Sequence, residues 1–189
     1  LVGLLKEKFS NIEFIAEDLG EPSPTVVKLL QDSQWPGMKV LEFAFDSGEA
    51  NDYQPHTYTT NCICYTGTHD NATIMEWYEE AKKADVSYAK SYLGISKSEA
   101  FNWGVIRGGM VSVAKLFVAQ MQDYLGLGKY NRINLPGTES GNWQWRMLEK
   151  ELTDELANKI YKMTKLYGRL TVDPKEAEKE IEKNESKKK

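Results

Sequence analysis

Two short apolar runs in the chain are each followed by acidic residues that could carry acid–base chemistry. Residues 12–16 (Ile-Glu-Phe-Ile-Ala) lead directly into Glu17-Asp18-Leu19-Gly20. Residues 62–65 (Cys-Ile-Cys-Tyr) lead into Thr-Gly-Thr and then His69, Asp70 and Asn71. In barrel enzymes the reacting groups lie at the carboxyl ends of parallel strands. We therefore interpret these acids as candidate catalytic groups of a barrel enzyme that acts on glycosidic bonds.

The composition predicts one globular domain. The chain has 189 residues, 41% of them hydrophobic and 11% aromatic, which is enough for a real core. The net charge of −4 argues against a nucleic-acid partner. No apolar stretch approaches the ~20 residues of a membrane-spanning helix, so no membrane association is expected.

The cysteines and histidines predict no metal or cofactor. Cys62 and Cys64 are two residues apart, so on a strand they point to the same face. We interpret them as reduced, buried thiols of a cytoplasmic protein. His56 and His69 are the only histidines, and no other residues have the spacing of metal ligands.

Apolar periodicity and capping residues predict alternating strands and helices. Predicted strands cover residues 12–16, 38–45, 62–65 and 131–135. The first predicted helix begins at Ser23-Pro24 and ends near Asp32, and the second begins at Asp70 or Asn71 and ends near Lys83. The third begins at the capping-box pattern Ser96…Glu99 and continues through Gly108-Gly109 to Tyr124. The last contains the buried stripe Leu152, Leu156, Ile160 and Met163.

This alternation favours an α/β fold with a parallel sheet. Four such units make half of an eight-unit barrel, and an isolated half would leave two open sheet edges. The chain also opens on Leu1, and residues 1–9 are typical of the end of an amphipathic helix. We therefore expect a truncated chain that begins within a fold. Twelve of the last 17 residues are Asp, Glu or Lys, so residues 171–189 are expected to form a disordered or frayed-helix tail after a domain over residues 1–170.

Four motifs in order resemble one enzyme family. They are Ile-Ala-Glu-Asp-Leu-Gly (residues 15–20), Pro-Gly-Met-Lys-Val-Leu (36–41), Tyr-Thr-Gly-Thr-His-Asp-Asn (65–71) and Asn-Leu-Pro-Gly-Thr (134–138), the last followed by Gly141-Asn142-Trp143. Together they resemble the C-terminal half of the 4-alpha-glucanotransferases, also called amylomaltases or disproportionating enzymes, over roughly residues 1–168. The resemblance implies strands five to eight of a (β/α)8 TIM barrel of the α-amylase clan. It also implies transfer of α-1,4-glucan segments between maltodextrin donors and acceptors.

The resemblance implies a role for each of five residues. Glu17 would be the acid/base of a retaining double displacement, first protonating the leaving oxygen and then deprotonating the acceptor hydroxyl. Asp70 would be a further catalytic carboxylate that binds the hydroxyls of the reacting sugar, and His69 would help to bind that sugar. Asn134 and Gly137 would border the glucose-binding cleft. The neighbouring Asp18 is interpreted as structural, and most of the tryptophans as core residues.

One element of the family's pattern is absent from the chain. The family's nucleophile is an aspartate in an Arg-x-Asp context, and none of the arginines at 107, 132, 146 and 169 is followed by x-Asp. We therefore expect the activity to require a missing N-terminal half of the barrel, and this chain alone to be inactive. Two alternatives remain: a hydrolase of the α-amylase clan, and a non-catalytic glucan-binding half-barrel. Longer products from maltotriose would indicate transfer, whereas glucose and maltose alone would indicate hydrolysis.

Overall fold

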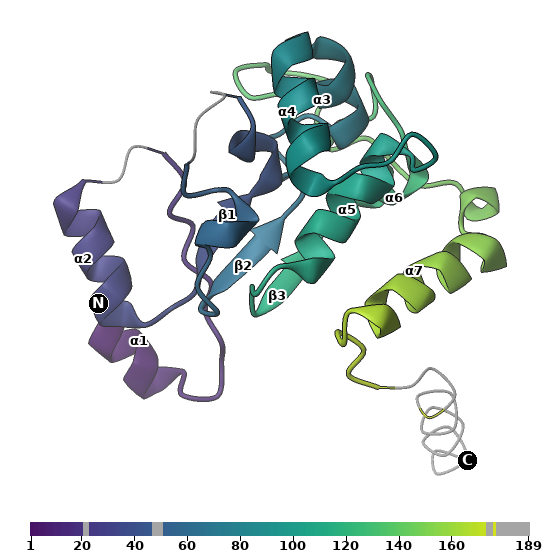
Figure 1. Cartoon of the computed structure of the whole chain (residues 1–189). Coiled ribbons are helices and arrows are strands. Elements are labelled where there is room, and N and C mark those ends of the chain that lie inside the picture. Colours follow the sequence, from purple (N-terminus) through teal and green to yellow (C-terminus); the bar gives the residue numbers. More distant parts are fainter. Residues whose placement is uncertain (21–22, 47–50, 173–175, 177–189) are drawn as a thin grey trace. The chain divides into compact units, whose positions relative to one another are not determined.

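The chain divides into two compact units, Leu1–Leu148 and Glu149–Lys189. The computed structural model describes residues 1–20, 23–46, 51–172 and 176 (Figure 1). The first unit contains a parallel sheet and six α-helices among its described residues. Apart from residues 171, 172 and 176, the expected charged tail lies outside the described residues.

Three short parallel strands form the sheet, in the order β1-β2-β3. They are β1 (Gly37–Val40), β2 (Cys62–Tyr65) and β3 (Leu116–Val118). Gly37 of β1 pairs with Cys62, and Ile63 of β2 pairs with Leu116. The expected α/β fold with a parallel sheet is therefore confirmed, and all three strands end at the same edge.

Some of the helices begin or end at residues with recognisable caps. Ser23 accepts a hydrogen bond from the Val26 N–H, and Pro24 occupies the first turn of the helix that follows. Gly126, with φ of +68°, ends α6 in the left-handed conformation. The helices of the first unit are α1 (Val2–Lys8), α2 (Pro24–Ser33), α3 (Ile74–Glu80), α4 (Lys83–Leu93), α5 (Phe101–Val111) and α6 (Met121–Leu125).

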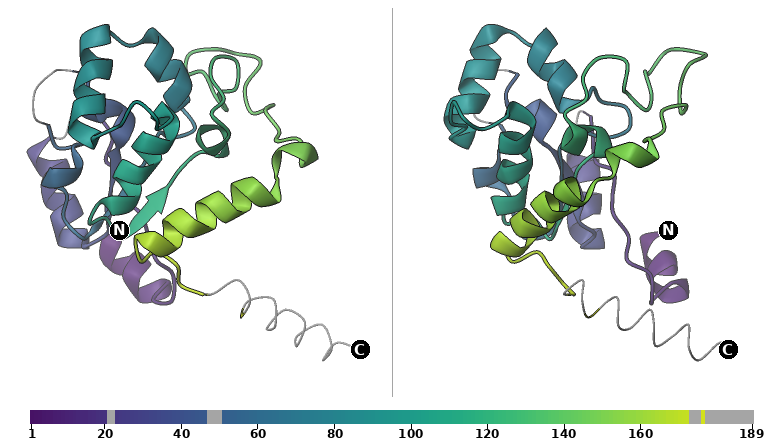
Figure 2. Two further views of the ribbon diagram at one scale, coloured as in Figure 1. Left: turned by 45° about the vertical axis from the view of Figure 1, so that its right-hand side comes forward. Right: turned by 90° about the vertical axis from the view of Figure 1, so that its right-hand side faces the viewer.

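The core forms where α3, α4 and α5 gather beside the sheet (Figure 2). Val40 and Cys64 of the strands and Ile106 of α5 are fully buried. A Cβ at Gly109 would collide with the ring of Phe117, so the absence of a side chain there lets α5 approach β3 closely. Both cysteines are buried thiols outside any disulfide, as expected.

The first predicted strand is wrong, and the second is correct only over part of its length. Residues 12–16 form no strand, and one backbone bond joins them to the sheet region, from Ala16 N to Pro36 O at 2.9 Å. The Met38 N–H, which a neighbouring strand would use, instead donates to Asp18 Oδ1 at 2.7 Å. The second prediction is correct only as far as Val40, because Leu41–Ala44 forms a 3-10 helix.

The predicted strand at residues 131–135 is also wrong. Two backbone bonds instead connect this stretch to separate loops. Asn134 N donates to His69 O, and Ile133 O accepts from Trp143 N. The third strand is β3, within a stretch predicted to be helical. Lys115 N donates to Cys62 O of β2, and Thr66 N, directly after β2, donates to Val118 O, so long-range pairing overrides the local pattern.

Two predicted helix starts are wrong. The cap of α3 is Thr73, whose hydroxyl accepts from Glu76 N, rather than Asp70 or Asn71. The Ser96…Glu99 pattern opens no helix, because the Glu99 carboxylate binds Arg107 at 2.8 Å and α5 begins at Phe101. A separate helix, α4, was not predicted.

The second unit contains α7 (Asp154–Leu166), which is capped by Thr153. The apolar stripe has the predicted helical spacing, but no residue of α7 is buried, and Leu152 is 58% exposed. Periodicity identifies the side chains that share a face, whereas burial requires a surface to cover that face. The stripe residues within α7, Leu156, Ile160 and Met163, are half-buried, and the full burial of this face stays a prediction.

Candidate active site

A cleft of about 460 Å³ lies at the carboxyl edge of the sheet. Tyr65 at the end of β2 and Val118 at the end of β3 line it, together with Met38 near the start of β1. Glu17 and His69 also line it. The structure thus brings together two of the five predicted site residues, one from each acidic motif.

Glu17 is positioned by the residues on either side of it. Ala16 is bonded to Pro36, and the Asp18 carboxylate holds the start of β1, consistent with a structural role for Asp18. A Cβ at Gly37 would lie 2.5 Å from Asp18 Oδ2, so a side chain there would displace the Asp18 carboxylate. The Glu17 side chain is exposed. Burial, together with the negative charge of Glu17, raises the pKa of the Tyr65 hydroxyl.

His69, Asp70 and Asn134 form a second group beside the cleft. Asn134 Nδ2 donates to Asp70 Oδ1 at 2.6 Å, and His69 Nε2 lies 3.4 Å from the same oxygen. The backbone adds a bond of 3.1 Å from Asn134 N to His69 O. The structure therefore joins residues that are 64 positions apart in the sequence.

Asp70 and Gly137 do not line the cleft that contains Glu17. Asp70 lines a second cleft of about 510 Å³, together with Glu42, Trp77 and Arg132. Gly137, with φ of +79°, lies in an exposed turn closed by the bond from Thr138 N to Leu135 O. The conformation explains the glycine at this turn, and no other atom lies within 4 Å of the position a Cβ would take.

Trp143 is a candidate site residue that the sequence analysis did not name as one. Its ring is 57% exposed and lies 5.0 Å from the His69 ring, centroid to centroid. Its φ is +62°, which is rare for a bulky side chain. Trp103, by contrast, is buried as expected. The position of Trp143 after Gly141, in a loop rather than at helical spacing, was the available sequence signal.

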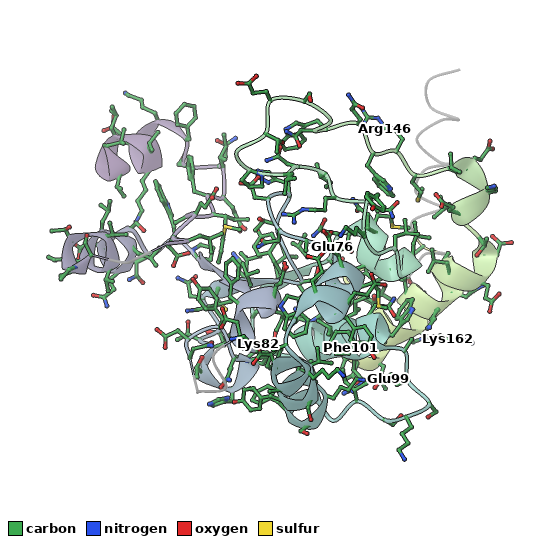
Figure 3. All side chains as sticks on the ribbon, turned by 90° about the horizontal axis from the view of Figure 1, so that it is seen from above. Glu76, Lys82, Glu99, Phe101, Arg146 and Lys162 are labelled. Carbon is green, nitrogen blue, oxygen red and sulfur yellow. The ribbon has the colours of Figure 1, made fainter. Side chains whose placement is uncertain are left out.

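Three acidic residues beneath the site were not predicted. Burial raises the pKa of Glu42 to about 8, with a further contribution from the Asp123 charge, and the Arg132 charge opposes this shift. Burial also raises the pKa of Asp123 to about 6, against the bonds it accepts from Thr66 and Ile74. Glu76 on α3 is 5% exposed (Figure 3). No local motif marks these residues, because they come from separate elements.

A family model described as 4-alpha-glucanotransferase matches residues 1–152. The chain belongs to this family. The family resemblance inferred from the four motifs is therefore confirmed.

Within the part of the chain that the structure describes, no group of three or more His, Cys, Asp or Glu side chains could hold a metal ion.

Curated relatives within the 4-alpha-glucanotransferase family extend well beyond this chain. The chain is 45% identical over 170 residues to the 4-alpha-glucanotransferase of Clostridium butyricum, covering 89% of this chain and 35% of that protein. It is 41% identical over 173 residues to that of Thermus thermophilus, covering 88% and 35%. The chain thus spans about a third of the length of these relatives.

Solved structures of two amylomaltases are similar to this structure. The amylomaltase from Streptococcus agalactiae in complex with acarbose has 36% sequence identity and a TM-score of 0.86, covering 89% of this chain and 34% of that chain. The amylomaltase from Corynebacterium glutamicum has 17% identity and a TM-score of 0.64, which shows a shared fold.

Proposed function

We propose that this chain is part of a 4-alpha-glucanotransferase that transfers α-1,4-glucan segments from maltodextrin donors to maltodextrin acceptors. The observation that carries the proposal is the placement of Glu17 and His69 in one cleft at the carboxyl edge of a parallel sheet, in a chain of this family. Residues 1–170 would be the C-terminal half of a (β/α)8 barrel, containing strands five to eight, with residues 171–189 as a charged tail.

The proposed reaction is a retaining double displacement. Glu17 protonates the leaving glycosidic oxygen and then removes the proton of the acceptor hydroxyl. Asp70 binds the hydroxyls of the reacting sugar, and His69 binds the same sugar from the strand β2 side. Asn134 fixes the Asp70 carboxylate through its 2.6 Å bond, and the turn at Gly137 borders the glucan. No cofactor takes part in this scheme.

The nucleophile of the proposed reaction comes from outside this chain. No Arg-x-Asp sequence is present, so the proposed activity needs a preceding half of the barrel. The outer strand β3 supports this proposal, since Leu116 is 47% and Val118 37% exposed. An apolar, unpaired edge is a liability for a protein unless another element covers it. This chain alone is expected to be inactive.

We place the protein in the cytoplasm, where maltodextrins and reduced thiols would both be available. The two buried cysteines form no disulfide, which fits a reducing compartment. No helix among the described residues is long and apolar enough to cross a bilayer.

Complementation tests the proposed function. The chain is mixed with a separately expressed N-terminal portion of the Clostridium butyricum relative, and the products formed from maltotriose are measured. We expect oligosaccharides longer than maltotriose. Glu17→Gln should reduce their formation at least 10²-fold, the usual contribution of a general acid or base. Glu13→Gln is the matched control, because Glu13 is exposed on the same segment and pairs with Lys115.

Other outcomes would reject parts of the proposal. Full activity in Glu17→Gln would remove Glu17 from the acid/base role. Glucose and maltose as the only products would indicate the hydrolase alternative. A folded, associated mixture that binds saccharide without turnover would indicate a non-catalytic glucan-binding half-barrel.

A further inference from the structure

Arg132 contacts three segments around the candidate site. Its Nη2 donates to the Asp70 carbonyl oxygen at 2.8 Å, and its Nε donates to the Asn134 carbonyl oxygen at 3.3 Å. Its Nη1 lies 3.7 Å from Glu76 Oε1 on α3. The side chain is 23% exposed, so the guanidinium is largely enclosed by these partners.

Two enclosed acidic side chains, Glu76 and Glu42, interact with the positive charge of Arg132. Glu76 is nearly buried, and neither Glu76 Oε2 nor Glu42 Oε2 has a hydrogen-bond partner among the described residues. Enclosed carboxylates are costly unless a cation balances them. Arg132 lies close enough to both acids to act on them: it pairs with Glu76, and its positive charge favours the ionised form of Glu42.

The loop over residues 66–74 carries His69 and Asp70, and hydrogen bonds with Asp123 and Gln120 hold its two ends. Asp123 accepts bonds from the Thr66 hydroxyl and the Ile74 N–H, and Gln120 Nε2 donates to the Ala72 carbonyl oxygen at 3.2 Å. The middle of the loop receives its contacts from Arg132 and Asn134.

We propose that Arg132 is a positioning residue, whose guanidinium is held by Glu76 and in turn sets the places of Asp70 and Asn134. Arg132 lines the second cleft beside Asp70 rather than the cleft that contains Glu17 and His69, and its two hydrogen bonds go to backbone carbonyl oxygens, so we assign it a positioning role. A guanidinium can donate to two carbonyl oxygens and face a carboxylate at once because its donors form a rigid planar fork, which a lysine ammonium lacks. The catalytic consequence of this arrangement rests on the proposed function.

Hydrogen exchange on the ¹⁵N-labelled, full 189-residue chain tests this role. The reporter is the Asn134 backbone N–H, which donates to His69 O, and the reference is the Thr66 N–H, which donates to Val118 O in the sheet. We expect Arg132→Lys and Arg132→Met to speed exchange at Asn134 at least tenfold, relative to Thr66. The Asn134 side-chain amide protons, bonded to Asp70, should shift toward free-amide values.

Arg107→Lys is the matched control. Arg107 is 26% exposed and pairs with Glu99 at 2.8 Å, so its replacement disturbs an equally enclosed ion pair away from the site. This variant should leave the exchange ratio of Asn134 to Thr66 unchanged. Glu76→Gln should raise the ratio, though less than Arg132→Met, because it removes the charge that holds the guanidinium.

Two results would overturn the positioning role. The first is an unchanged Asn134 signal in Arg132→Lys. The second is equal loss of protection at Asn134 and Thr66 in Arg132→Lys, which would assign Arg132 to general stability. A parallel acarbose titration of the complemented mixture keeps the two proposals separate. If Arg132→Lys speeds exchange at Asn134 as expected but the unaltered mixture does not bind acarbose, the positioning role is retained and the proposed function is rejected.

Discussion

At the scale of single residues, Trp143 combines a strained backbone with an exposed ring. Its φ of +62° is costly for a bulky residue, and such conformations concentrate at functional sites. The ring lies against His69 at the rim of the cleft. An exposed aromatic face next to the histidine that we propose to bind the sugar is suited to stack on the apolar face of a glucose ring.

We therefore predict that Trp143→Ala weakens acarbose binding by the complemented mixture about tenfold, equivalent to about 1.4 kcal/mol, whereas Trp143→Phe retains most of the affinity. Isothermal titration calorimetry measures both. Tyr130→Ala is the control, because Tyr130 is also exposed, at 90%, and also has a positive φ, but its ring lies beside Lys129 rather than His69. Equal affinities for Trp143→Ala and the unaltered chain would exclude stacking.

At the scale of elements, the segment before β1 is attached through Asp18. In place of a strand ladder, one carboxylate bond to Met38 N and one backbone bond at Ala16 connect it to the start of β1. The position of Glu17 in the cleft thus depends on a side-chain contact made by its neighbour.

Asp18→Ala should lower the free energy of unfolding by about 1–3 kcal/mol, because the enclosed Met38 N–H loses its acceptor. Urea denaturation measures the loss, and hydrogen exchange at Met38 locates it. Asp18→Asn keeps a carbonyl acceptor and should recover most of the stability. Unchanged protection of the Met38 N–H in Asp18→Ala would show that this bond does not hold the segment.

At the scale of the whole molecule, the enclosed acids link folding to pH. The pKa of Glu42 rises from 4.5 to about 8 on folding, so the folded state binds the proton more tightly than the unfolded state. The tighter binding of this proton stabilises the folded state fully below pH 4.5, and this stabilisation is lost as the pH rises toward 8. Asp123, with its pKa raised to about 6, acts in the same direction at lower pH.

Glu42→Gln removes the proton-binding group while keeping a neutral side chain of similar shape. We predict little difference from the unaltered chain near pH 4, and a variant that is more stable by a few kcal/mol at pH 8, since each pKa unit corresponds to about 1.4 kcal/mol. Urea denaturation at several pH values measures this difference. Glu139→Gln, at an exposed position, should show no such trend. A pH-independent difference for Glu42→Gln would contradict the linkage.

The sequence by itself determined the family, the parallel α/β class and the elements with strong local signals. The Ser23-Pro24 cap starts α2, the apolar run at residues 62–65 forms β2, and residues 2–8 form α1. Each of these depends on neighbouring residues alone, so propensity and capping suffice. The same motifs also identified Glu17 and His69, which share the cleft.

The tertiary structure alone decided the third strand, the attachment of residues 12–18 and the contacts beneath the site. Strand β3 exists through its pairing with β2, and Asp18 replaces a ladder bond that residues 12–16 were expected to make. Arg132 meets Asp70 and Glu76 across 62 and 56 sequence positions, respectively. No local pattern encodes such a meeting, because it depends on how the strands and helices pack after each has formed.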